Sequence, residues 1–192
     1  MKATKSALLV GVGGQGAILT AKVLVNGLMK AGYDVKMSEV HGMSQRGGSV
    51  STQVHWGEKV HSPVIGKGAA DIIVAFEKME ALRWLPYLKK GGSIVVNDFV
   101  INPAPVNQGQ AEYPEGIIED LAAKVKVVSL KAGDMAAELG NPKAMNVVLL
   151  GALVKAIGTL DDVDWMKHIE KNVKPKFVEL NKKAFQAGYD FK

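Results

Sequence analysis

The most constraining feature of the sequence is a glycine cluster that separates an apolar run from a helical repeat. Residues Ser6 to Val12 form a short, almost continuously apolar run, which is typical of a buried strand. Apolar residues then recur at helical spacing from Gln15 to Lys30, and Gly32 is placed to end that helix. The junction carries Gly11, Gly13, Gly14, Gln15 and Gly16. A strand that enters a helix through such a turn predicts the first unit of an open α/β sheet.

The rest of the chain continues this alternation. We predict strands at residues 34–40, 49–56, 71–76, 93–97 and 125–130, and helices at 78–88, 117–123, 133–139, 145–157, 164–172 and 175–187. The stretch 102–114 is rich in proline, asparagine and glutamine and is predicted to be an ordered surface loop. Residues 49–56 alternate between two faces, which indicates one half-exposed or antiparallel strand. We therefore expect a single domain over residues 1–192: a three-layer, Rossmann-like α/β fold with a mostly parallel sheet and helices on both faces.

The glycine turn has three alternative interpretations. The glycines can serve only the tight packing of strand against helix, or their backbone N–H groups and the helix N-terminus can bind a phosphate or another anion. The spacing also matches G-x-G-x-x-G, the turn that binds a dinucleotide. That third interpretation requires an acidic residue after the second strand for a ribose hydroxyl, and Glu39 is in about that place. Gln15 can either cap the helix or point into a cleft.

A second polar loop follows the second predicted strand, so we expect it at the carboxyl edge of the sheet, beside the glycine turn on a neighbouring parallel strand. Its candidate binding or interface residues are Glu39, His41, Ser44, Gln45, Arg46, Gly47 and Gly48. The Arg46 guanidinium can hold a carboxylate or a phosphate through two parallel hydrogen bonds, or it can pair internally with Glu39. The position of His41 alone does not favour a catalytic or ligand-binding role for its imidazole. The spacing assigns neither a catalytic base–nucleophile pair nor a set of metal-binding histidines.

Composition excludes several function classes. The chain has 192 residues, a net charge of +5 and no cysteine, so it cannot form disulfides or supply cysteine ligands to zinc or iron–sulfur clusters. This agrees with a reducing cytoplasm. The lysines of the last third have the spacing of solvated helix faces, and no basic run is interleaved with aromatic residues, so we expect no nucleic-acid partner. The apolar runs are too short for a membrane span, and the apolar run near the start leads directly into glycines, so we expect neither a membrane helix nor an export signal.

Together, the two loops resemble the gamma domain of pyruvate and ketoacid oxidoreductases. The segment EVHGMSQRGG is most similar to that of the small subunits of indolepyruvate:ferredoxin oxidoreductases. Further matches are the Ser62-Pro63-Val64-Ile65 segment, Glu77-x-x-Glu80-Ala81, Asn146 with Leu150-Gly151, and Ala184-Phe185-x-x-Gly188. The resemblance covers nearly the whole chain, and the paired loops are specific in combination.

The resemblance implies a function for the assembly. Such a complex converts an aryl 2-oxoacid to its coenzyme A thioester and reduces ferredoxin, using thiamine diphosphate, magnesium and 4Fe-4S clusters. These cofactors are expected on a large alpha subunit, because this chain lacks cysteine and a G-D-G…N thiamine diphosphate signature. The chain is then expected to bind no cofactor tightly, to carry no catalytic residue and to contact ferredoxin only indirectly. A free-standing NAD(P)-dependent oxidoreductase and a non-catalytic nucleotide-binding module remain the alternatives.

Overall fold

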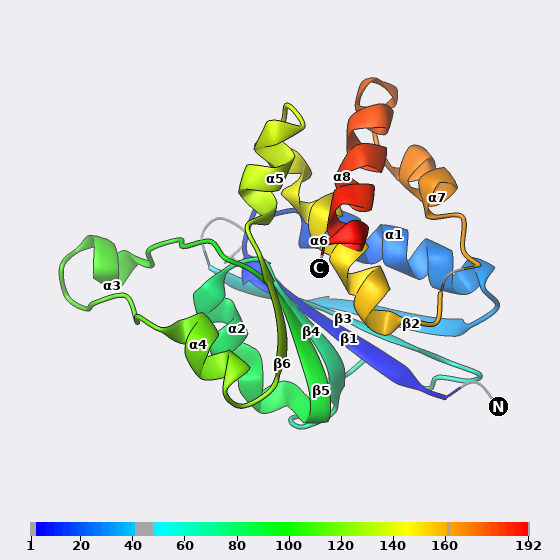
Figure 1. Ribbon diagram of the computed structural model, residues 1–192. Coiled ribbons are helices and arrows are strands. Elements are labelled where there is room, and N and C mark those ends of the chain that lie inside the picture. Colours follow the sequence, from blue (N-terminus) through cyan, green and yellow to red (C-terminus); the bar gives the residue numbers. More distant parts are fainter. Residues whose placement is uncertain (1–2, 41–47, 161, 192) are drawn as a thin grey trace.

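The fold is built around one six-stranded sheet, shown in a computed structural model that describes residues 3–40, 48–160 and 162–191 (Figure 1). The strands are β1 (Lys5–Val12), β2 (Asp34–Val40), β3 (Ser49–Gly57), β4 (Ala70–Ala75), β5 (Leu88–Asn97) and β6 (Lys126–Leu130). Their order is β2-β3-β1-β4-β5-β6. Strand β3 is antiparallel to both of its neighbours, whereas β1, β4, β5 and β6 pair in parallel. Five of the six therefore run in one direction, which confirms the mostly parallel sheet.

Helices cover both faces of the sheet, and the three-layer architecture is confirmed (Figure 1). The helices are α1 (Ala17–Lys30), α2 (Lys78–Trp84), α3 (Ala104–Asn107), α4 (Ile117–Ala122), α5 (Ala132–Glu138), α6 (Met145–Ile157), α7 (Trp165–Asn172) and α8 (Val178–Asp190). Helices α1 and α5 to α8 pack on one face and bury the larger apolar core, which includes Trp56 and Leu149. Helices α2 and α4 cover the other face and bury a smaller core around Leu8 and Ile94.

The position of β3 corrects one sequence-based expectation. We expected the strands before the two polar loops to be neighbours, but β3 lies between β2 and β1. The strand is antiparallel, as its alternating pattern indicated, yet it is an interior strand rather than a peripheral one. Its apolar side packs into the larger core through Val54 and Trp56, which accounts for its place inside the sheet. The start of β3 still meets the ends of both neighbours, because Ser49 pairs with Val12 and Ser51 pairs with Val40.

The boundaries of some elements differ from those predicted. The helix predicted at residues 78–88 ends at Trp84 and continues as a 3₁₀ turn over Leu85–Tyr87, because Pro86 has no N–H group with which to continue an α-helix. Strand β5 begins at Leu88, earlier than predicted, and takes in Gly91, whose φ of 79° accompanies a shift of register against β4. The predicted surface loop contains the short helix α3.

Two glycines allow helices α6 and α8 to cross at close range. A Cβ atom on Gly188 would lie 1.8 Å from the carbonyl oxygen of Val148, and one on Gly151 would lie 2.0 Å from that of Phe185. The obstructing atoms belong to the backbone, so a rotamer change cannot relieve either contact. Both glycines fall in segments that carry the family resemblance, and the structure explains them by packing.

We predict that Gly188→Ala destabilises the fold by about 2–3 kcal/mol, because the added methyl group must force the two helices apart. Unfolding in urea, followed by circular dichroism, measures this change. Gly133→Ala in α5 is the matched control, since its Cβ would meet nothing within 4 Å. The control should be neutral or should stabilise the protein by up to about 1 kcal/mol, because alanine favours a helix over glycine. Equal effects of the two substitutions would contradict the close-crossing argument.

Candidate functional site at the carboxyl edge of the sheet

The glycine turn is shaped by two left-handed glycines and one amide side chain. Gly14 has φ 98° and Gly16 has φ 86°, values that side chains rarely adopt, whereas Gly13 does not have a positive φ. The Gln15 side chain accepts a hydrogen bond from the Val12 N–H at 2.7 Å and donates one to the carbonyl of Phe76 at 2.9 Å. Gln15 therefore joins the end of β1 to the end of β4. It does not cap α1, whose N-cap residue is Gly16.

The amide of Gln15 also fills the space that the first glycine leaves. A Cβ on Gly11 would lie 2.8 Å from Gln15 Oε1 and 2.9 Å from the Phe76 Cβ atom. Gly16 faces Asn146 at the start of α6 in the same way, because a Cβ on Gly16 would lie 2.5 Å from Asn146 Nδ2. At these two positions the glycines serve close packing. Gly14 differs, because a Cβ there would meet no atom of the described residues within 4 Å, so these residues leave the outer side of the turn open.

The structure brings the end of the second polar loop against the glycine turn. The Gly13 N–H donates to the carbonyl of Gly48 at 3.0 Å, and Ser49 pairs with Val12 in the sheet. The other predicted loop residues lie outside the described residues: His41, Ser44, Gln45, Arg46 and Gly47. Their roles stay predictions, supported by the fact that both flanks of the loop, Val40 and Gly48, lie at the carboxyl edge.

Glu39 lies too far along the sheet for the ribose-binding role. It pairs with Thr52 on β3 and is half-buried on the edge strand β2. Because β3 is inserted, β2 lies two strand spacings from β1, or roughly 10 Å. In a dinucleotide-binding sheet the acidic residue ends the strand next to β1. The inserted strand therefore argues against the dinucleotide interpretation.

A hollow of about 350 Å³ opens beside the turn. The turn and the start of α1 form one side and the strands β2 and β3 the other, with lining residues Val12, Gly13, Gly14, Gln15, Gly16, Ala17, Ile18, Val40, Val50, Ser51 and Thr52. None of these described residues carries a charge. The first N–H groups of α1 have no partners within the helix, so this end of the hollow is the one suited to an anion or to carbonyl oxygens of a partner chain.

A buried acidic network lies at the same edge; its two glutamates were part of the family resemblance but were not predicted as site residues. Glu77 and Glu80 are only 1% and 3% exposed. Glu80 accepts hydrogen bonds from the Ser49 hydroxyl and from Trp84 Nε1, and it forms an ion pair with Arg83 at 3.0 Å. Glu80 thus holds the first residue of β3 directly after the polar loop. The signal in the sequence was a glutamate followed three residues later by another, directly after a strand, which is typical of a helix start.

Glu77 performs a second structural role. Its carboxylate accepts from the Glu80 N–H at 3.1 Å, which caps α2, and from the Tyr113 hydroxyl. Burial and the hydrogen bond to Glu77 raise the pKa of Tyr113 above its ordinary range, so this hydroxyl remains a neutral donor at physiological pH. All of these contacts are internal, so the two buried glutamates are structural supports of the edge.

The residues of this chain do not fit the redox cofactors implied by the resemblance. The chain contains no cysteine for an iron–sulfur cluster. Within the described ranges, no group of three histidine, aspartate or glutamate side chains is arranged to hold a metal ion such as magnesium. The buried carboxylates at the carboxyl edge already accept hydrogen bonds from protein groups. No step of cofactor chemistry can therefore be assigned to these side chains.

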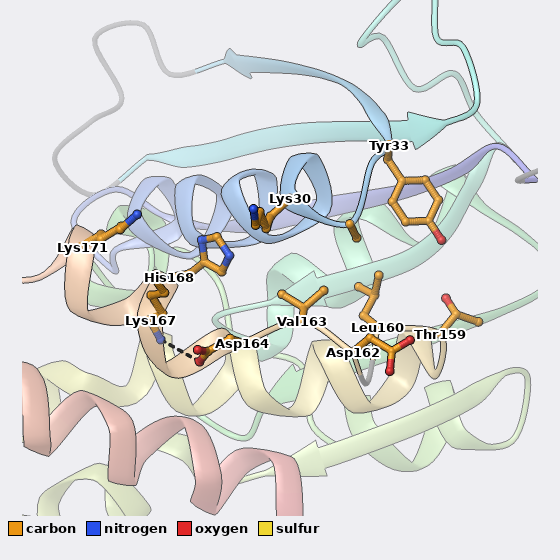
Figure 2. A pocket seen from close by; sticks show the side chains of 11 residues that line it. Lys30, Tyr33, Thr159, Leu160, Asp162, Val163, Asp164, Lys167, His168 and Lys171 are labelled. Atoms are coloured by element: carbon orange, nitrogen blue, oxygen red, sulfur yellow. Dashed lines mark hydrogen bonds between the residues drawn. The ribbon is translucent and has the colours of Figure 1, made fainter.

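A larger hollow, of about 610 Å³, lies at the opposite edge of the sheet (Figure 2). It is lined by the end of α1, the connection before α7 and α7 itself, and its titratable lining residues include Lys30, Asp162, Asp164, Lys167, His168 and Lys171. Partial burial and, to a lesser extent, the nearby positive charge of Lys171 lower the pKa of His168 below its ordinary value. The imidazole is therefore neutral at physiological pH. None of the residues predicted for binding lines this hollow.

Comparison with known proteins decides the family. The sequence matches the pyruvate ferredoxin/flavodoxin oxidoreductase family over residues 6–191. This chain belongs to that family. It is 41% identical over 188 residues to the indolepyruvate oxidoreductase subunit IorB of Pyrococcus horikoshii, with 94% of this chain and 92% of the relative covered.

Solved structures of the oxidoreductase family share the fold. The gamma subunit of a keto/oxoacid ferredoxin oxidoreductase from Geobacter sulfurreducens has a TM-score of 0.76 at 23% identity, and the match covers 98% of this chain and 96% of that one. The 2-oxoglutarate:ferredoxin oxidoreductase from Magnetococcus marinus has a TM-score of 0.72 at 19% identity. There the match covers 98% of this chain but 31% of the other, so the fold forms about a third of a longer polypeptide.

The geometry of the glycine turn predicts different losses of folding stability for two glycine-to-alanine substitutions. Gly14→Ala should cost about 1–2 kcal/mol, because alanine must adopt φ near 98° although the space around it is open. Gly16→Ala should cost more, because the same backbone strain is joined by a clash with Asn146. Urea unfolding of the two variants measures the order. A Gly14→Ala protein that is less stable than Gly16→Ala would contradict this description of the turn.

Proposed function

We propose that this chain is the small subunit of an indolepyruvate:ferredoxin oxidoreductase, folded as a single domain over residues 1–192. The complex would convert an aryl 2-oxoacid to its acyl-CoA and reduce ferredoxin. The observation that carries the proposal is the 41% identity to an indolepyruvate oxidoreductase subunit over nearly the full length of both chains. The absence of cysteine supports an auxiliary role, because electron transfer through iron–sulfur clusters must then take place on another chain.

The proposal divides the work between two subunits. The large alpha subunit would hold thiamine diphosphate, magnesium and 4Fe-4S clusters and would pass electrons to ferredoxin, so this chain would meet ferredoxin only indirectly. These cofactors supply the decarboxylation and the electron transfer. The small subunit would add binding surface and orientation. A cytoplasmic location is part of the proposal and is consistent with a chain that forms no disulfides.

The carboxyl edge is the part of this chain that we assign to the complex. Its proposed contact residues are Gly11, Gly13, Gly14, Gln15 and Gly16 of the turn, with Glu39, His41, Ser44, Gln45, Arg46, Gly47 and Gly48 of the loop. The open outer side of Gly14 and the start of α1 suit a phosphate of coenzyme A or the backbone of the partner. Gly11 and Gly16 would act indirectly, since each provides room for a neighbouring side chain.

Activity of the separated and recombined subunits tests the proposal. The isolated chain should be colourless and should show no oxidoreductase activity, because it has neither cysteine ligands nor a thiamine diphosphate signature. Mixing it with the large subunit should restore viologen or ferredoxin reduction that depends on an aryl 2-oxoacid and coenzyme A. Turnover by the isolated chain with NAD(H) or NADP(H) would instead support the free-standing oxidoreductase, and a thermal shift with nucleotides alone would support a nucleotide-binding module.

Arg46 is predicted to contribute to assembly or to coenzyme A binding. Arg46→Ala should leave the stability of the isolated chain within about 1 kcal/mol, as at other surface positions. Binding to the large subunit, or the KM for coenzyme A, should worsen at least about tenfold, equivalent to about 1.4 kcal/mol. Arg46→Lys should recover only part of the loss, because an ammonium group cannot form the two parallel bonds of a guanidinium.

The control for Arg46 is Lys67→Ala, which removes an exposed positive charge from the connection before β4, at the opposite edge of the sheet. It should assemble and turn over normally. If Arg46→Ala also behaves normally, the remaining interpretation is an internal pair within the loop.

A further inference from the structure

A projecting arm, residues 98–113, is largely exposed. It leaves the end of β5, carries α3 and returns to α4, and it extends away from both helical layers (Figure 1). Phe99 is 45% exposed and Val100 is 40% exposed. The thirteen residues from Phe99 to Ala111 include no charged side chain, in a chain of which 22% is charged. The arm thus presents exposed apolar side chains on a stretch without charged residues.

The base of the arm is fixed by the buried carboxylate of Glu77. This group accepts a hydrogen bond from the Ile101 N–H at 3.4 Å, on the segment that leaves β5, and from the Tyr113 hydroxyl, on the segment that returns to α4. The carbonyl of Phe99 accepts from the Lys78 N–H at 3.1 Å, and an ion pair joins Lys78 to Asp98 at 3.2 Å. Both ends of the arm are thereby attached to the start of α2.

The tip of the arm is ordered by its own backbone. The carbonyl of Pro103 accepts from the N–H groups of Val106 and Asn107, at 3.0 and 3.1 Å. The Asn107 side chain donates to the carbonyl of Asn102 at 3.0 Å, and Pro103 and Pro105 restrict the backbone further. A segment ordered in this way loses little further conformational entropy on binding, which favours association.

We propose that this arm is the element by which the chain docks on its large subunit, with Phe99 and Val100 entering an apolar, uncharged groove of that partner. This inference rests on the proposed function. The arm starts at the carboxyl end of β5, the same edge that carries the glycine turn and the polar loop, so docking through it would hold that edge against the partner. The Magnetococcus marinus protein shows that this fold also occurs as a third of one longer chain, where it is covalently joined to further domains.

Two valine-to-aspartate substitutions, one on the arm and one away from it, test the proposal. Val100→Asp places a charge on the arm, and Val64→Asp places the same charge at a more exposed valine, 64% accessible, on the connection between β3 and β4. Each purified variant is first compared with the wild-type chain by thermal unfolding. Its affinity for the purified large subunit is then measured by biolayer interferometry, and its activity is measured in the recombined complex. A tip deletion, with residues 104–111 replaced by two glycines, provides a second arm variant.

We expect Val100→Asp and the tip deletion to weaken the affinity for the large subunit at least about tenfold, because an unpaired charge or a missing apolar contact at a docked surface is costly. Val64→Asp should retain the wild-type affinity, and all variants should unfold close to the wild-type temperature. Equal affinity of the arm variants and the wild-type chain would overturn the arm as the docking element while leaving the proposed function intact. An equal loss in Val64→Asp would also overturn it. So would an arm substitution that only dissociates a dimer of this chain. If the wild-type chain fails to bind the large subunit at all, both the inference and the proposed function fail.

Discussion

The carbonyl oxygen of Phe76 is the point on which the carboxyl edge of the sheet depends. It accepts hydrogen bonds from two amide side chains, Gln15 at 2.9 Å and Asn97 at 3.2 Å. Gln15 in turn accepts from the Val12 N–H, and Asn97, fully buried, accepts from the Ala132 N–H at the start of α5. One continuous chain of hydrogen bonds thus joins the ends of β1, β4 and β5 to the start of α5. Buried polar groups are tolerated in a core only when they are satisfied in this way.

This arrangement explains why a glycine-rich turn is compatible with a function other than dinucleotide binding. In a dinucleotide site the glycines leave room for a pyrophosphate. Here Gln15 fills the room above Gly11, Asn146 fills the room beside Gly16, and the Gly13 N–H is used by Gly48. The inserted strand β3 also separates Glu39 from β1. Among the described residues of the turn, the outer side of Gly14 and the start of α1 remain open to another molecule.

Much of the fold followed from local patterns, because short apolar runs and helical repeats report burial directly. The helix over Met145–Ile157 agrees with the sequence-based boundaries, and five of six strands run in parallel as expected. The place of β3 could not be predicted, because an alternating strand is compatible with an edge or an interior position. The family resemblance identified Glu77 and Glu80 as matching residues without indicating what they contact. Those contacts, to Tyr113 and Ser49, span more than thirty residues of sequence and arise only in the folded chain.

At the carboxyl edge of the sheet, the buried carboxylates of the described residues are held by the chain itself. A catalytic edge needs groups held for substrate, such as a carboxylate with unused acceptor capacity or a base within reach of a nucleophile. At this edge the described carboxylates Glu77 and Glu80 accept from side chains and backbone of the same chain, and the Tyr113 hydroxyl is held as a donor to Glu77. Each of these bonds attaches a loop to the sheet: Glu80 holds the start of β3 after the polar loop, and Glu77 holds the base of the arm. The buried charges therefore stabilise the two segments that a partner could contact. An edge ordered from within in this way can present backbone and apolar side chains to another protein, and such a surface needs no redox-active residue of its own.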